Sequence, residues 1–240
     1  MTTLLYKELA GLDRKAHAKL RIKKSDNLDF ADNINSAPLA GIEFFEASRD
    51  FPVLFAKGEN GEIFSLALFS LQKQSHSVED WSEVYIPAFI RRYPFAKAGD
   101  GNVVIDIKAP QLQEEEGDPL FKEDGTNSEF LDTVIGFLNH METQYKVTKE
   151  YCQACAEREL LTPFNVQVSV SEDEKPIRLD TLYVIDEKKL NELPDEQVTD
   201  WFRKGWLGWS FAHLHSLGAM RRLVKRDRKV VDMKEEPAET

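Results

Sequence analysis

The stretch Phe51-Pro-Val-Leu-Phe-Ala-Lys-Gly-Glu-Asn-Gly-Glu-Ile-Phe-Ser-Leu-Ala-Leu-Phe-Ser-Leu71 contains two short apolar runs separated by a polar turn. An Asn-Gly pair between two apolar runs indicates a β-hairpin, because both residues tolerate the left-handed backbone of a tight turn. Asn60 and Gly61 therefore predict that the run from Phe51 to Ala56 pairs with the run from Ile63 to Leu71 as antiparallel strands.

Two further segments extend this pattern. Gly99-Asp-Gly-Asn102 separates Phe95 to Ala98 from Val103 to Ile107 and predicts a second hairpin, and the apolar run Pro38 to Phe45 is expected to be another strand. Strands joined by short turns favour an antiparallel, curved sheet in the N-terminal half over parallel βαβ units.

The second half is predicted to be mostly helical, which makes the fold class α+β. Ser128 is a suitable N-cap for a long helix through Leu160, ended by Thr162-Pro163, and a C-terminal helical segment should run from about Gly208 to Arg226. No repeat or long linker divides the chain, so we expect one domain over residues 1–228 and an acidic, disordered tail over residues 229–240. Between the two helices we expect a strand pair, Phe164 to Val170 with Ile177 to Ile185 joined by Ser171 to Pro176, and short helices over Glu187 to Leu193 and Asp195 to Lys204, the latter stopped by Gly205.

Composition bounds the class of protein. The chain has 240 residues, of which 42% are hydrophobic and 30% charged, enough to bury a substantial core. Its longest apolar run is far shorter than the ~18 residues of a membrane-spanning helix, and the amino terminus lacks the features of a secretory signal. We therefore expect a soluble, cytoplasmic protein. The net charge of −11 disfavours binding to nucleic acid or to an anionic membrane.

The charge is unevenly distributed. Six acids and one lysine lie between Gln113 and Asp124, whereas six bases and one acid lie between Arg221 and Val230. Such blocks are either solvated surface or contacts with a partner or between subunits, so the sequence leaves a homo-oligomer open.

The only cysteines, Cys152 and Cys155, have the Cys-x-x-Cys spacing of redox and metal sites. They fall on the apolar side of the predicted long helix, near its end, whereas redox pairs favour the start of a helix. A second pair of ligands for zinc is missing nearby. We predict that both thiols pack as small hydrophobic groups, and we assign no metal and no cofactor.

The run Tyr85-Ile-Pro-Ala-Phe-Ile-Arg-Arg-Tyr-Pro-Phe95 supplies the main candidate binding residues. A short helix opened by Pro87 would bury one apolar face and direct Arg91 and Arg92 away from it, where their guanidiniums can bind a carboxylate. The alternative is that Arg92 pairs with an acid of the 113–124 block. The full candidate ligand-binding set is Arg49, Tyr85, Arg91, Arg92, Tyr93, Trp206, Trp209 and His213, with the aromatic residues as walls.

Two readings are open for residues of the last helix. His213 is expected to be a buried, hydrogen-bonded core residue, and Trp209 equally fits a place in the core. The alternative makes His213 the acid or base of an enzyme, although no orienting acid lies near it and its neighbour Ser216. His213 and His215 lie about 200° apart around a helix, so they cannot share a metal.

Several phrases along the chain resemble the bacterial SapC family, which is named after a surface-layer protein and is distinct from the peptide-transport permease of the same name. Ile-Arg-Arg-Tyr-Pro is the most distinctive part. The phrases are Asn35-Ser-Ala-Pro-Leu-Ala-Gly-Ile-Glu-Phe44, Phe51-Pro-Val-Leu-Phe55, Tyr85-Ile-Pro-Ala-Phe-Ile-Arg-Arg-Tyr-Pro-Phe95, Glu115-Glu-Gly-Asp-Pro-Leu-Phe121 and Ala212-His-Leu-His-Ser-Leu217.

The resemblance implies a cytosolic companion of outer-membrane uptake receptors and of proteins similar to flavin-dependent tryptophan halogenases; it implies no catalytic residue. The leading hypothesis is a non-catalytic binding or accessory protein for a peptide, an aromatic carboxylate or such a partner enzyme. An enzyme acting on a peptide or aromatic substrate through His213 is the second hypothesis. A surface-layer structural protein is the third.

Overall fold

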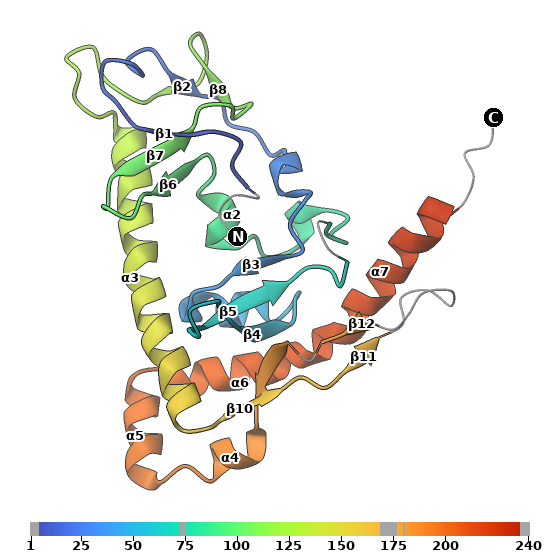
Figure 1. The fold of residues 1–240 in the computed structure, drawn as a ribbon. Helices are drawn as coiled ribbons and strands as arrows, with labels where there is room; N and C mark the ends of the chain where they lie inside the picture. The colour runs from blue at the N-terminus through green and yellow to red at the C-terminus, as the bar shows by residue number, and fades with distance from the viewer. Residues whose placement is uncertain (1–4, 73–74, 169–176, 180, 236–240) are drawn as a thin grey trace. The chain divides into compact units, whose positions relative to one another are not determined.

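A computed structural model describes residues 5–72, 75–168, 177–179 and 181–235, with side chains described up to residue 228 (Figure 1). Residue contacts group the chain into two compact units, residues 1–33 with 88–143 and residues 34–87 with 144–240. The chain therefore passes between the units three times, and no single linker separates them in the sequence. The single domain over residues 1–228 stays a prediction.

The first unit contains two small antiparallel sheets (Figure 1). The hairpin predicted around residues 99–102 is confirmed, because β6 pairs with β7 and Gly101 has φ +85° at the turn. The chain before Asn35, for which the sequence predicted no helix or strand, supplies β1 and β2, each too short to show a period. The strand orders of the two sheets are β1-β7-β6 and β8-β2-β9. The strands are β1 Leu9–Gly11, β2 Arg21–Ile22, β6 Phe95–Lys97, β7 Val103–Asp106, β8 Leu112–Gln113 and β9 Asp118–Pro119. The short helices of this unit are η2 Asp29–Ala31 and α2 Ala88–Arg91.

Helix α3 (Glu129–Glu157) contributes residues to both units. Its predicted N-cap is confirmed, since the backbone N–H of Leu131 donates to Ser128 Oγ at 3.1 Å. Leu131 and Leu138 pack into the core of the first unit with buried residues of the two sheets. The expected end at Leu160 is wrong: the helix ends at Glu157, Glu159 takes a left-handed φ of 52°, and the chain continues as a strand.

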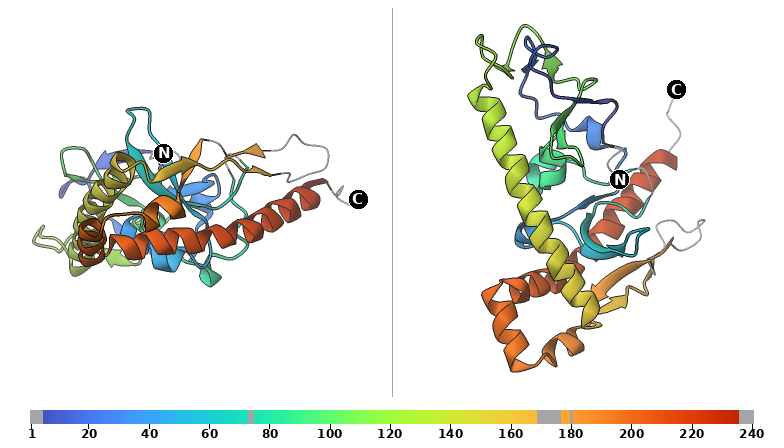
Figure 2. Two further views of the ribbon diagram at one scale, coloured as in Figure 1. Left: turned by 90° about the horizontal axis from the view of Figure 1, so that it is seen from below. Right: turned by 60° about the vertical axis from the view of Figure 1, so that its left-hand side comes forward.

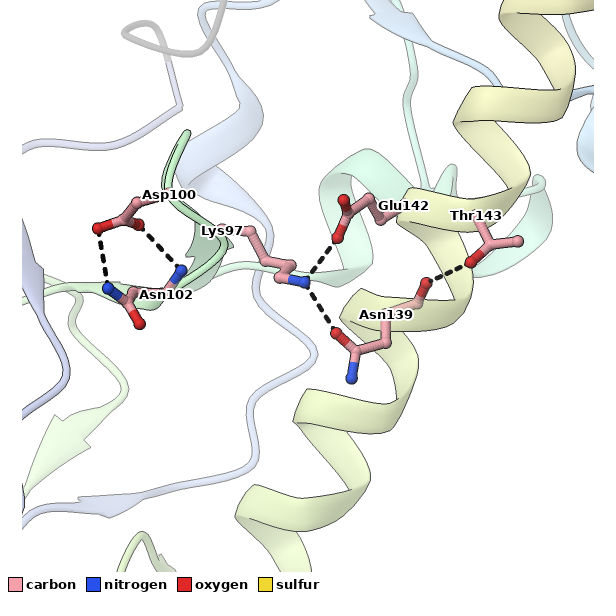
Figure 3. Close-up of polar contacts among 6 residues, drawn as sticks. All are labelled: Lys97, Asp100, Asn102, Asn139, Glu142 and Thr143. Atoms are coloured by element: carbon pink, nitrogen blue, oxygen red, sulfur yellow. Dashed lines mark hydrogen bonds and ion pairs between the residues drawn. The ribbon is translucent and has the colours of Figure 1, made fainter.

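A polar contact ties β6 to α3 inside the first unit. Lys97 Nζ donates to Asn139 Oδ1 at 2.8 Å and lies 2.6 Å from Glu142 Oε2 (Figure 3). The turn that follows β6 is held by Asp100, whose carboxylate accepts the backbone N–H of Asn102 at 3.0 Å. The hairpin and the helix are therefore joined by charge as well as by apolar packing.

The second unit is built on a five-stranded antiparallel sheet. The Asn60-Gly61 hairpin is confirmed, because β4 pairs with β5 over five residue pairs and Gly61 has φ +83°. The sheet order is β10-β13-β4-β5-β3, with β3 Ser36–Pro38, β4 Val53–Lys57, β5 Ile63–Leu68, β10 Leu161–Pro163 and β13 Leu182–Ile185.

The predicted strand from Pro38 to Phe45 is wrong beyond Pro38. The chain turns there into η3 (Gly41–Glu43) and α1 (Phe44–Ala47). One local contact and one contact from a distant segment hold this turn. The Glu43 carboxylate accepts the backbone N–H of Ala40 at 2.8 Å, and the N–H of Gly41 donates to Thr148 Oγ1 at 2.7 Å.

The predicted helical end of the chain is present with different boundaries. Gly205, with φ +76°, separates two helices as expected. The single last helix is instead two α-helices joined by η5 (Leu217–Ala219), and α7 turns away from the direction of α6 (Figure 1; Figure 2, right). The helix continues to Glu235, so the disordered tail is wrong for residues 229–235; residues 236–240 lie outside the described part. The helices are α4 Glu187–Asn191, α5 Asp195–Arg203, α6 Trp206–Ser216 and α7 Met220–Glu235, and η4 spans Trp81–Glu83.

The remaining predicted strand pair is present in shortened form. β11 (Gln167–Val168) pairs antiparallel with β12 (Ile177–Arg178). The expected connection from Ser171 to Pro176 lies outside the described residues. Among the helices that the structure describes, none combines the length and the apolar character that crossing a membrane requires.

Candidate functional site

A groove of about 560 Å³ lies within the first unit. Its lining comes from four places: the end of β2 with the loop after it, the segment from α2 into β6, the residue before β8, and the first turns of α3. The lining is mainly apolar and aromatic, which is the character of sites for small organic ligands. Its apolar residues include Ile22, Leu28, Phe30, Ile90, Phe95, Phe130, Val134 and Phe137, and its polar residues include Lys23, Lys24, Ser25, Asp26, Arg91, Arg92, Gln111 and Thr133.

Helix α2 places the two adjacent arginines at this groove. The short helix predicted after Pro87 is confirmed, and Phe89 and Ile90 are buried as expected. Arg91 is exposed, with its guanidinium 5.6 Å from the centre of the Phe137 ring. Arg92 is half-buried over the Phe89 ring at 4.3 Å.

Arg92 is unusual in its hydrogen bonding. Its Nε is buried and has no hydrogen-bond partner among the described residues, while its guanidinium also lies 5.9 Å from the centre of the Tyr6 ring. A buried N–H without a partner costs free energy, about 1–3 kcal/mol.

Tyr93 forms a rigid part of the lining. Its ring stacks on Phe30 with centroids 3.9 Å apart, and its hydroxyl donates to the buried carboxylate of Asp106 at 3.2 Å. Burial, together with the neighbouring Asp106 carboxylate, raises the pKa of the Tyr93 hydroxyl, which therefore stays neutral. Asp106 also accepts the backbone N–H groups of Lys7 and Glu8, at 2.8 and 2.9 Å.

The groove is positively charged although the chain is acidic. Its lining contains four basic residues and one acid, Asp26, in a protein of net charge −11. Lys23 pairs with Glu116 at 2.8 Å and Lys24 lies 3.8 Å from Asp118, both as exposed pairs. In the described structure, two acids of the 113–124 block, Glu116 and Asp118, thus pair with lysines, and no ion pair joins Arg92 to the block.

The other five predicted site residues belong to the second unit. Trp206 and Trp209 are buried and pack against the buried ring of Tyr151, with centroids 5.8 and 5.4 Å apart. A Cβ on Gly41 would lie 2.3 Å from the Trp209 ring, so only glycine fits there. Both tryptophans fill the core of this unit, and Phe30, Phe95 and other phenylalanines supply the aromatic lining of the groove instead.

His213 is also a core residue, as expected. It is fully buried, its Nδ1 lies 2.7 Å from the carbonyl oxygen of Val53, and its Nε2 accepts the backbone N–H of Ile185 at 3.0 Å. Burial lowers the pKa of His213 to about 4. Ser216 Oγ donates to the carbonyl oxygen of His213 at 2.5 Å and not to the ring, so these two side chains form no nucleophile–base pair.

The last two predicted site residues, Arg49 and Tyr85, contact other residues of the second unit. Arg49 is exposed and pairs with Glu46, one turn away. The Tyr85 hydroxyl donates to Glu43 Oε1 at 2.9 Å, and its backbone N–H donates to Asp50 Oδ2 at 2.9 Å.

The two cysteines have the structural role predicted for them. Both are fully buried free thiols on α3. Burial raises the pKa of Cys152 to about 12 and also raises that of Cys155, so neither is a reactive thiolate near neutral pH. Within the described residues, no group of three or more His, Cys, Asp or Glu side chains is placed to hold a metal ion.

Sequence reasoning missed much of the lining. Phe130, Val134 and Phe137 lay on the expected apolar face of the long helix, and nothing in their spacing distinguishes a groove from a core. Lys23 and Phe30 lie before Asn35, in a stretch for which the sequence predicted no helix or strand. Gln111 carried no signal at all.

Comparison with models of protein families shows to which family the chain belongs. The model of the SapC family matches residues 12–223. The chain belongs to the SapC family. The matched range contains every residue that lines the groove, and the membership indicated by the quoted phrases is confirmed. Searches of curated proteins and of solved structures found no match.

Proposed function

We propose that this SapC protein is a non-catalytic binding protein whose groove in the first unit takes a small organic anion with an apolar body. The observation that carries the proposal is Arg92, whose half-buried guanidinium lies in the lining of a mainly apolar groove. Arginine binds carboxylates through charge-assisted hydrogen bonds, which are stronger than neutral ones.

The remainder of the lining supports the same class of ligand. Phe30, Phe95 and Phe130 offer apolar surface to the body of a ligand, and Arg91 adds a second positive charge. The volume of about 560 Å³ lies within the range of sites that hold small molecules. An aromatic carboxylate satisfies both the charge and the apolar surface.

The proposal is tested by isothermal titration calorimetry with phenylacetate and with the neutral phenylacetamide. We expect the carboxylate to bind more tightly, and we expect Arg92→Gln to weaken its binding by about 10- to 100-fold, the effect of losing one charge-assisted hydrogen bond. Arg14→Gln is the matched control, because Arg14 is exposed in the same unit and does not line the groove. Binding that is absent, or equal in wild type and Arg92→Gln, would overturn the proposal.

The other hypotheses have less support from the structure. An enzyme using His213 draws little support from a ring whose two nitrogens both contact backbone groups. A partner enzyme similar to flavin-dependent tryptophan halogenases, a cytoplasmic location and a surface-layer role all stay predictions. Fractionation of native cells, followed by native mass spectrometry of the purified protein, distinguishes them.

A further inference from the structure

Tyr6 lies beside Arg92 but is not part of the groove lining. Its side chain is buried, and its hydroxyl donates to the backbone carbonyl oxygen of Phe95 at 2.9 Å. A buried tyrosine hydroxyl usually has such a partner, so this bond by itself indicates only a structural role. The proximity of Tyr6 to Arg92 is what relates it to the site.

The Arg92 guanidinium lies beside two aromatic rings. It is 4.3 Å from the centre of the Phe89 ring and 5.9 Å from the centre of the Tyr6 ring, both within the range of cation–π attraction. It also interacts with the Tyr6 hydroxyl: burial raises the pKa of this hydroxyl, and the Arg92 charge opposes that rise. Both neighbours are therefore neutral near pH 7, so they hold the guanidinium without neutralising its charge.

Backbone contacts fix the positions of both residues. The N–H of Arg92 donates to the carbonyl oxygen of Ala88 at 3.0 Å, and its carbonyl oxygen accepts the N–H of Phe95 at 2.8 Å. The buried carboxylate of Asp106 accepts the N–H groups of the two residues that follow Tyr6, at 2.8 and 2.9 Å. Tyr6 is thus held firmly enough to support the long side chain of Arg92.

We infer that Tyr6 is a positioning residue of the groove, which holds the Arg92 guanidinium in the orientation that binds the anionic group of a ligand. The inference rests on the proposed function, since it assumes that Arg92 binds an organic anion. A side chain that is already oriented loses less conformational entropy when a ligand binds. Removing the support should therefore weaken the recognition of charge and leave the apolar contacts of the ligand unchanged.

The test measures, by isothermal titration calorimetry, the ratio of the affinities for phenylacetate and for the neutral phenylacetamide. Tyr6→Phe removes the hydroxyl and should weaken phenylacetate binding by about 3- to 10-fold, the effect of losing one hydrogen-bonding group. Phenylacetamide binding should stay near the wild-type value, whereas a purely structural role would change both affinities together. Tyr151→Phe is the matched control, because it removes a buried, hydrogen-bonded hydroxyl from the second unit. Its affinity ratio should equal that of the wild type.

A double mutant assigns the effect to Arg92. In the Arg92→Gln background, Tyr6→Phe should change the affinity ratio by less than about twofold, because the side chain that Tyr6 holds is gone. Effects of the two substitutions that simply add would show that Tyr6 acts independently of Arg92, and would overturn the inference.

The outcomes separate the inference from the proposed function. A preference for phenylacetate that is lost in Arg92→Gln but kept in Tyr6→Phe would overturn the inference alone. A wild type without this preference would overturn both. Thermal melting shows whether Tyr6→Phe folds; if it does not, Arg92→Lys decides, since lysine keeps the charge but not the guanidinium. Its preference should fall towards that of Arg92→Gln, and a wild-type preference in Arg92→Lys would overturn the inference.

Discussion

The two units contain the same kinds of side chain and use them differently. In the first unit, Arg92 and a set of phenylalanines line a groove, and Gln111 is left with an unpaired oxygen among the described residues. In the second unit, the tryptophans of α5 and α6 and the histidine of α6 are packed into the core. The comparison teaches that aromatic and titratable residues mark a binding site only where packing leaves space beside them.

The centre of the second unit shows aromatic side chains that are packed into a core. Tyr151 is fully buried, and its ring lies within 6.3 Å of the Phe44 ring and 5.4 Å of the Trp209 ring, centre to centre. Its hydroxyl is hydrogen bonded to Ser210 Oγ at 2.9 Å. Polar and aromatic groups here stabilise the fold of their own unit, as His213 does beside them.

The largest loss of stability should come from removing a tryptophan of this core. Trp209→Ala should lower the free energy of unfolding by about 3–5 kcal/mol, because it leaves a large cavity among buried rings. Urea denaturation followed by circular dichroism measures the change. Phe202→Ala, at a side chain that is 75% exposed, is the control and should stay within about 0.5 kcal/mol. A stable Trp209→Ala that loses phenylacetate binding would break the comparison.

A pH series sharpens the comparison at His213. The pKa of this residue falls from 6.5 to about 4 on folding, so the unfolded chain takes up the proton first. The stability contributed by the neutral ring is complete above pH 6.5 and is lost as the pH falls towards 4, by about 3 kcal/mol in total. The difference in unfolding free energy between wild type and His213→Gln, which cannot take up this proton, should shrink over that window. A difference that is constant with pH would contradict a buried, neutral histidine.

The smallest loss of stability is expected at Lys97, a paired cation of the first unit. Lys97→Met removes the contacts with Asn139 and Glu142 and should cost about 1 kcal/mol of unfolding free energy, as expected for a partly exposed ion pair. Phenylacetate binding should not change, since Lys97 does not line the groove. Lys19→Met, at an exposed residue of the same unit, serves as the reference. Weakened binding in Lys97→Met alone would contradict the expectation that Lys97 stabilises the fold without taking part in the groove.

The features that the sequence predicted correctly depend on neighbours along the chain. Asn60-Gly61 and the Gly99–Asn102 turn each join two strands, Ser128 caps α3, and Gly205 separates α5 from α6. Turns and caps form from a few consecutive residues, so they can be predicted without knowledge of the rest of the molecule. The burial of both cysteines followed in the same way from the apolar face of one helix.

The predictions that failed, and the site itself, depend on contacts between distant segments. The run after Pro38 is apolar enough for a strand, yet it forms a turn and short helices, where the backbone N–H of Gly41 donates to the distant Thr148. The groove joins residues from Ile22 to Phe137, and no period along the chain relates them.

The sequence by itself determined the α+β class, the hairpins, the SapC family and the two arginines of α2 as candidates for binding an anion. Only the tertiary structure decided that Arg91, Arg92 and Tyr93 line a groove, that the tryptophans and His213 are core, and that Gln111 belongs to the site. The physical reason is that burial and hydrogen-bond partners are properties of the folded surroundings of a side chain, which distant parts of the chain supply.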